Sequence, residues 1–325
     1  MDLIAASLGA VDALLSREDA EAVATFHESV THHPRTAWIL SYTGVSNEPR
    51  VLRQAWSLGR AGWNVVVAGF EGHSPRPPEW NYAQLQDRPR SRSVSFRGAL
   101  LLQRMAGKQL YIRAARIPAL ASVGGRAYYF GLPNWRQNHR EILRIATSLP
   151  HLVGSLVIAH DFHTCPPAAA LASAWDAPFI VDCHEYGRGQ YMDNPEWVRD
   201  GRFFATAIQD HYLALADAVT TVSDGLAERL TAEQRLRRPA MTLRSLPFRQ
   251  PQPFRPTGDR IDVVYHGIVS TDRGLAELVR SVALWLPHIR LTIRGSGDAL
   301  PILREIARAC GVAGRVSFEP PVPFA

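Results

Sequence analysis

Cysteine is scarce in this chain of 325 residues: Cys165, Cys183 and Cys310 are far apart in the sequence. Three scattered thiols are too few for a disulfide framework or a zinc knuckle. Long apolar runs are also lacking, and without eighteen consecutive apolar residues no membrane-spanning helix is expected. The first stretch carries acids early and has no basic start, which does not fit a secretory signal. These absences predict a reduced, cytoplasmic protein.

Acidic residues are absent from residues 88–140, which contain eleven Lys or Arg, so the positive excess of the chain lies in this segment. Such a patch usually meets lipid headgroups, nucleic acid or a phosphorylated substrate. On a helix Arg97, Arg104 and Lys108 share one side, but the apolar residues do not collect opposite, so an amphipathic membrane helix fits only in part. No nucleic-acid-binding module surrounds the segment, and we expect no nucleic acid partner. A solvated arginine-rich surface and an anionic membrane surface remain open.

Apolar runs alternate with helical patterns through most of the chain. The spacing predicts a helical extension over residues 1–30, followed by alternating elements. Strands are predicted over residues 36–41, 64–69, 155–159, 178–182, 218–222 and 241–245, and helices over 49–60, 168–175, 196–216 and 224–230. Strands that are apolar on both faces and alternate with helices are typical of a doubly wound, Rossmann-like α/β domain with a parallel sheet.

Four prolines in residues 246–260 mark an extended linker. A second βα pattern follows, with strands over 261–267, 289–297 and 315–320 and helices over 273–286 and up to 310. Three strands are fewer than a separate open sheet usually has, so we expect the second domain to be incomplete.

Four segments together resemble the family 4 glycosyltransferases of the GT-B fold. They are TAWILSYTGVSNEPRVLRQAWSLGRAGWNVVVAG, AHDFHTCPPAAALASAWDAPFIVDCHE, ADAVTTVSDGLAERL and DVVYHGIVSTDRGLAELVRSVALWLPHIRLTIRGSGD. The resemblance implies an α/β fold of two Rossmann-like domains: an acceptor-side domain over 31–245 and, after the linker, the first part of a nucleotide-sugar (donor) domain over 261–325. It further implies transfer of a sugar from a nucleotide sugar to a saccharide or lipid-linked acceptor, with retention and without a metal or other cofactor. In the resembled family the part of the acceptor domain that corresponds to residues 88–140 often touches the membrane or a lipid-linked acceptor, which implies a peripheral position on the inner face of the membrane.

Polar residues follow two neighbouring predicted strands. His160, Asp161 and His163 end one strand, and Asp182, His184 and Glu185 end the next. Open α/β sheets bind ligands at this edge. Two histidines with carboxylates also suit zinc or iron, and a polar strand end satisfied by its neighbours is a third interpretation. The resemblance implies that His160 is catalytic and faces the reacting sugar, with Asp161, His184 and Glu185 on the acceptor side and no metal.

Arg273 is the leading candidate for binding the donor diphosphate. It precedes a predicted helix, and a guanidinium beside helix amides suits a pyrophosphate. In the resembled family a lysine usually stands here, and a second basic residue often follows the preceding glycine, where this chain has Ile268. The remaining donor-site candidates are glycines in strand-to-helix loops: Gly44, Gly267, Gly274, Gly295 and Gly297.

A metal-independent glycosyltransferase with Arg273 and His160 as its catalytic residues is therefore the first hypothesis. A non-catalytic sugar- or nucleotide-binding protein, or an inactive fragment, is the alternative, favoured by Ile268 and by the three-stranded second domain. A metal hydrolase built on the two polar strand ends is the third. Because the family's sugar- and ribose-binding carboxylates have no counterpart before Ala325, we expect little transfer by this chain alone.

Overall fold

A computed structural model describes residues 35–322, except 46–47, 73–79, 86–132, 193, 196, 199–201, 247–250, 252 and 255. The chain divides into two compact units, Met1–Leu246 and Pro247–Ala325. The predicted extension over 1–30 and the basic residues Arg97, Arg104 and Lys108 lie outside the described residues.

The first unit contains a seven-stranded sheet with the order β3-β2-β1-β4-β5-β6-β7, in which every neighbouring pair is parallel. Its strands are β1 (Thr36–Gly44), β2 (Asn64–Phe70), β3 (Asn81–Leu85), β4 (Leu156–His160), β5 (Phe179–Cys183), β6 (Ala218–Thr221) and β7 (Met241–Thr242). Its α-helices are α2 (Pro49–Arg60), α5 (Pro133–Ser148), α6 (Cys165–Ala174), α7 (Arg202–Leu215) and α8 (Asp224–Glu233). Short 3-10 turns cover Pro150–Leu152, Phe162–Thr164 and Gly187–Gly189. The predicted doubly wound architecture is confirmed.

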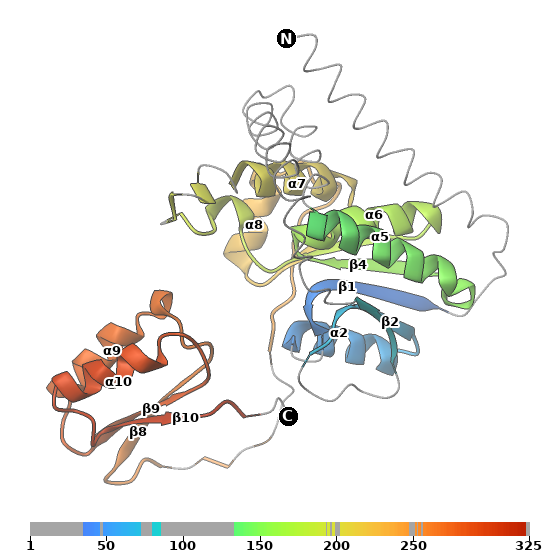
Figure 1. The fold of residues 1–325 in the computed structure, drawn as a ribbon. Helices are drawn as coiled ribbons and strands as arrows, with labels where there is room; N and C mark the ends of the chain where they lie inside the picture. The colour runs from blue at the N-terminus through green and yellow to red at the C-terminus, as the bar shows by residue number, and fades with distance from the viewer. Residues whose placement is uncertain are drawn as a thin grey trace, which may run out of the picture. The chain divides into compact units, whose positions relative to one another are not determined.

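Alternate residues of the central strands supply two separate cores. On one face Ile39, Val65 and Val67 pack with Val51 and Ala55 of α2. The intervening strand residues point to the other face of the sheet, where they pack against α5, α6 and α7 in the second core. Figure 1 shows α2 on one side of the sheet and α5 and α6 on the other. Both faces are buried, which explains why the strands are apolar throughout.

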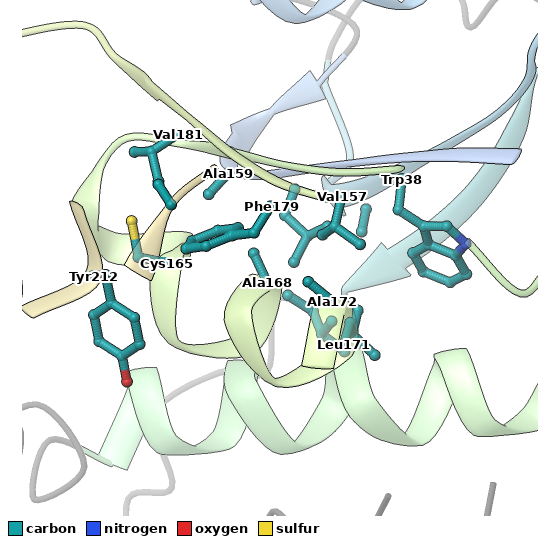
Figure 2. Packing of buried hydrophobic residues seen from close by; sticks show 14 of the residues in the cluster. Trp38, Val157, Ala159, Cys165, Ala168, Leu171, Ala172, Phe179, Val181 and Tyr212 are labelled. Carbon is teal, nitrogen blue, oxygen red and sulfur yellow. The ribbon is translucent and has the colours of Figure 1, made fainter. Parts of the chain in front are cut away.

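Small residues allow α6 to lie close to the sheet. Ala168 and Ala172 face the strand side chains Val157 and Phe179, and all four are buried (Figure 2). Trp38 lies near the amino-terminal end of β4, where its indole N–H donates to the Leu152 carbonyl at 2.7 Å. This packing holds the ends of β4 and β5 in fixed positions.

The strand order reverses between β1 and β4, because the chain moves outward from β1 through β2 to β3 and then returns to the other side of β1. In open α/β sheets the carboxyl ends of the strands at such a point form a crevice that accepts ligands. His160 is the last residue of β4, and Asp182 lies next to it on β5, paired in register. The topology therefore places the two predicted polar strand ends at the switch point.

The second unit contains three parallel strands in the order β10-β9-β8. They are β8 (Ile261–His266), β9 (Ile289–Arg294) and β10 (Val316–Glu319), and they alternate with α9 (Leu275–Ser281) and α10 (Leu300–Ala309). The 3-10 turns Thr271–Arg273 and Val282–Leu284 flank α9. Leu275, Val279, Leu303 and Ala307 of the helices share one core with the strands.

The structure differs from the sequence prediction in several elements. Strand β3 and helix α5 were not predicted; β3 precedes the basic segment 88–140, and α5 begins within it. The helix predicted over 273–286 is instead the short α9 between two 3-10 turns, and Gly274 adopts a left-handed conformation at φ 66° that separates Arg273 from the helix. α7 begins at Arg202, within the helix predicted over 196–216.

Candidate functional site

Four side chains form a hydrogen-bonded network at the switch point, which we call the switch-point network: Gln54 of α2, His160 of β4, Asp182 of β5, and His184, which directly follows β5. His160 Nδ1 lies 2.8 Å from His184 Nε2, and His160 Nε2 lies 3.0 Å from Gln54 Oε1. The Gln54 amide nitrogen donates to Asp182 Oδ2 at 2.8 Å. Thr220 of β6 donates to Asp182 Oδ1 at 2.7 Å. The network therefore links α2 to three adjacent strands.

The direction of each hydrogen bond follows from Asp182. Because the Gln54 amide donates to this carboxylate, its oxygen faces His160 and accepts from Nε2–H. In a neutral His160 ring Nδ1 then accepts, and the proton of that bond comes from His184 Nε2. Burial lowers the pKa of His160 to about 3, with a further decrease from the charge of Arg50. Burial also lowers the pKa of His184 to about 3. Both rings are therefore neutral at pH 7.

His160 is 3% exposed, and both of its ring nitrogens bond within the protein. Beside it the side chains of His184, 15% exposed, and Asp161, 26% exposed, reach solvent. The predicted contact of His160 with a sugar stays a prediction. In this structure it would require His160 to give up its bond to Gln54 or His184.

Asp161 has the unusual backbone angles φ 62° and ψ 168°. A non-glycine residue in this region carries strain of about 1–3 kcal/mol, and such strain is concentrated at functional sites. Its Oδ1 accepts the His184 backbone N–H at 3.1 Å, and its Oδ2 lies 3.6 Å from His184 Nδ1. Burial, the largest cause, raises the pKa of Asp161 to about 7. Near neutral pH this carboxyl group can therefore act as a proton donor or acceptor.

The other predicted strand-end residues do not join the network. His163 stacks on Phe162 with ring centroids 3.8 Å apart, and burial lowers its pKa to about 4. Glu185 is exposed, and its charge contributes to the raised pKa of Asp161.

Among the described residues, His160, Asp182 and His184 are the group whose donor atoms could converge on a metal, since one atom from each lies within 4.8 Å of the others. Two neutral imidazoles and a carboxylate form a donor set suited to zinc. The positions of these atoms are also explained without a metal. His160 Nδ1 and His184 Nε2 are hydrogen-bonded at 2.8 Å, and Asp182 accepts hydrogen bonds from Gln54 and Thr220.

Sequence reasoning missed Arg50 and Gln54 of α2. The signal was present: the two residues are four apart on the helix that follows the Gly44 loop, so they share one face of it. Val51 and Ala55, one position further along, are buried in the core. What the pattern could not reveal is that the polar face meets the ends of β4 and β5.

In the second unit Arg273 is exposed, and no hydrogen bond or ion pair is found for its guanidinium among the residues described. Gly274 follows it with the left-handed conformation noted above. The two glycines after β9 are explained by close backbone packing. A Cβ on Gly295 would lie 1.9 Å from the Gly267 oxygen, and a Cβ on Gly297 would lie 2.0 Å from the Val269 oxygen. The loops after β8 and β9 therefore pack backbone against backbone. In the first unit a Cβ on Gly44 would lie 3.1 Å from Gly72 Cα.

Two Rossmann-like units, the first with a polar switch point, define a GT-B type of α/β protein. The family described as glycosyl transferase 4-like domain matches residues 47–246, more than half of the chain and all of the switch-point network. The chain belongs to this family of glycosyltransferases. None of the curated proteins matches the sequence significantly.

Solved structures support the fold at low sequence identity. Sucrose-phosphate synthase from Thermosynechococcus elongatus is 14% identical, with 89% of this chain and 71% of that chain covered and a TM-score of 0.59. HepE from Anabaena, solved in complex with UDP-glucose, is 12% identical, with 89% of this chain and 70% of HepE covered and a TM-score of 0.54. The lipopolysaccharide outer core galactosyltransferase WaaB is 14% identical, with 89% and 68% covered and a TM-score of 0.51. These similarities show the GT-B fold.

Proposed function

We propose that this glycosyltransferase moves a sugar from a nucleotide sugar to an acceptor hydroxyl, with retention and without a metal ion. The observation that carries the proposal is the family match over residues 47–246, which includes every residue of the switch-point network. The similarity to HepE, which binds UDP-glucose, supports a nucleotide-sugar donor. Retention and metal independence are carried over from the family resemblance.

Arg273 is proposed to bind the donor diphosphate. Its exposed guanidinium is free to pair with phosphate oxygens, and it would stabilise the negative charge that develops on the leaving diphosphate. Positive charge supplied by a side chain would make a divalent cation on the diphosphate unnecessary. Gly274 lets the chain turn directly after Arg273, which keeps the guanidinium outside the helix.

His160 is proposed to act through its neighbours. It holds the imidazole of His184 in one tautomer and orients Gln54, so that Asp161 and His184 form the acceptor side of the crevice. Glu185 is an outer member of this acceptor side. Gly44 is proposed to let a substrate approach the backbone at the end of β1, and the loop glycines Gly267, Gly295 and Gly297 to support the donor loops.

The nature of the acceptor, saccharide or lipid-linked, and a cytoplasmic position at the inner face of the membrane are further parts of the proposal. The basic segment 88–140 supports them through its charge. Within the described part of the chain, no helix is both long and apolar enough to cross a membrane.

Titration of the full chain with UDP and UDP-sugars, followed by assay of sugar transfer, tests the function. Arg273→Ala should weaken UDP binding about tenfold or more, because one charge-assisted contact is lost. Arg294→Ala is a matched control: Arg294 lies on β9 and donates to the Pro320 carbonyl. Product analysis by NMR reads the anomeric configuration, and activity in EDTA reads the metal requirement.

A non-catalytic nucleotide-binding protein is the competing function. Ile268, 65% exposed, stands where the resembled family often has a second cation. Binding of UDP-sugar without any turnover would favour this function, and turnover that is lost in EDTA would refute the metal-free mechanism.

A further inference from the structure

Among the residues that the structure describes, Arg50 presents a positive charge without a partner. Its Nε and Nη1 atoms are buried and make no hydrogen bond. Among the described residues no carboxylate forms an ion pair with it, whereas Arg188 is paired with Asp210 and Arg53 bonds to Ser245. Buried donors are normally satisfied, and an unsatisfied one in a native protein calls for an explanation.

The charge of Arg50 reaches the switch-point network. It helps to lower the pKa of His160 and of His184, and it opposes the burial that raises the pKa of Asp161. Among the described residues none of these groups forms a hydrogen bond or ion pair with the guanidinium: both imidazoles are neutral, and Asp161 instead accepts the backbone N–H of His184. The carboxylate of Asp182 accepts from Gln54 and Thr220.

Solvent reaches this place through Asp161 and His184, whose side chains are 26% and 15% exposed. Arg50 shares a face of α2 with Gln54 of the network, and a ligand that enters there would reach the two unused, buried N–H groups by a movement of the Arg50 side chain. The planar donors of arginine match two oxygens of one phosphate or carboxylate group. A neutral sugar hydroxyl would satisfy the hydrogen bonds but leave the charge uncompensated.

We propose that Arg50 binds an oxyanion of the acceptor, so that the acceptor is an acidic saccharide carrying a phosphate or a carboxylate group. This inference rests on the proposed transfer to a saccharide acceptor. It assigns to Arg50 the selection of an acidic acceptor over a neutral one, beside Asp161 and His184.

The test measures binding to the full chain of glucose 6-phosphate, glucuronate, glucose and UDP. The wild type should bind at least one of the two acidic sugars at least tenfold more tightly than glucose, and whichever of them binds identifies the oxyanion as phosphate or carboxylate. Arg50→Met should abolish this preference, leave UDP binding unchanged, and leave the urea unfolding midpoint unchanged or higher, since an unsatisfied buried cation is removed. Arg50→Lys should restore part of the preference. Arg53→Met, on the same helix, should behave as the wild type.

A wild type that binds glucose as tightly as both acidic sugars would overturn the inference, as would a preference that survives in Arg50→Met. An equal loss of UDP binding in Arg50→Met would assign Arg50 to the donor and overturn the acceptor assignment. Failure of the proposed donor site is seen separately, because it appears as unchanged UDP binding in Arg273→Ala.

Discussion

Replacing Gln54 by methionine removes the amide that connects α2 to the switch-point network, while the length of the side chain is kept. Two buried partners lose their bonds: the Nε2–H of His160, at 3.0 Å, and Oδ2 of the fully buried Asp182, at 2.8 Å. Leaving a buried polar group without its partner costs about 1–3 kcal/mol. For two such groups we expect a loss of about 2–6 kcal/mol in the free energy of unfolding.

Urea unfolding followed by tryptophan fluorescence measures this loss, because seven of the eight tryptophans lie before residue 247 and report on the first unit. The matched control is Gln84→Met, which removes an exposed bond of 3.0 Å to Glu71. An exposed polar pair contributes about 0–1 kcal/mol, so the control should change little. If Gln54→Met shifts the unfolding midpoint no more than Gln84→Met does, the network does not hold α2 against the sheet and its hydrogen bonds are wrongly assigned.

Three further predictions concern pH, loop packing and the basic segment. Between about pH 4 and 6.5, His160, His163 and His184 are neutral in the folded chain and protonated in the unfolded one, because burial lowers their pKa values to about 3, 4 and 3. Asp161, whose pKa is raised to about 7, is protonated in the folded chain and releases one proton on unfolding, so unfolding takes up a net two protons. The free energy of unfolding should therefore fall by up to about 2.7 kcal/mol for each pH unit of acidification in this window. Urea unfolding at pH 6.5, 5.5 and 4.5 measures this fall, and equal stabilities would contradict the neutral histidines. Gly297→Ala should destabilise the second unit by about 3 kcal/mol, since its Cβ would lie 2.0 Å from the Val269 oxygen; amide exchange on β9 should show the loss, and Gly314→Ala, with open space around its Cβ, should not. If segment 88–140 binds anionic membranes, the protein should co-sediment with acidic vesicles at low salt and be released near about 0.5 M salt, and equal sedimentation with neutral vesicles would exclude this binding.

The local pattern of apolar residues was enough to predict the alternating strands and helices of the first unit. Runs such as NVVVAG and SLVIA are apolar on both faces, which only a sheet covered by helices on both sides can bury. The same pattern showed His160 and Asp182 at strand ends, because a strand ends where its apolar run ends. It failed at α9, where the left-handed Gly274 and two 3-10 turns interrupt a sequence that is helical in composition.

Tertiary structure alone decided which polar groups meet. Gln54 and His160 are 106 positions apart, and their contact depends on β4 pairing with β1 rather than with β3. Strand order is set by how whole elements pack, and no local periodicity encodes it. The exposure of single atoms is likewise a tertiary property: the sequence places an arginine at position 50, but only the packing around α2 leaves two of its nitrogens buried and, among the described residues, without a partner.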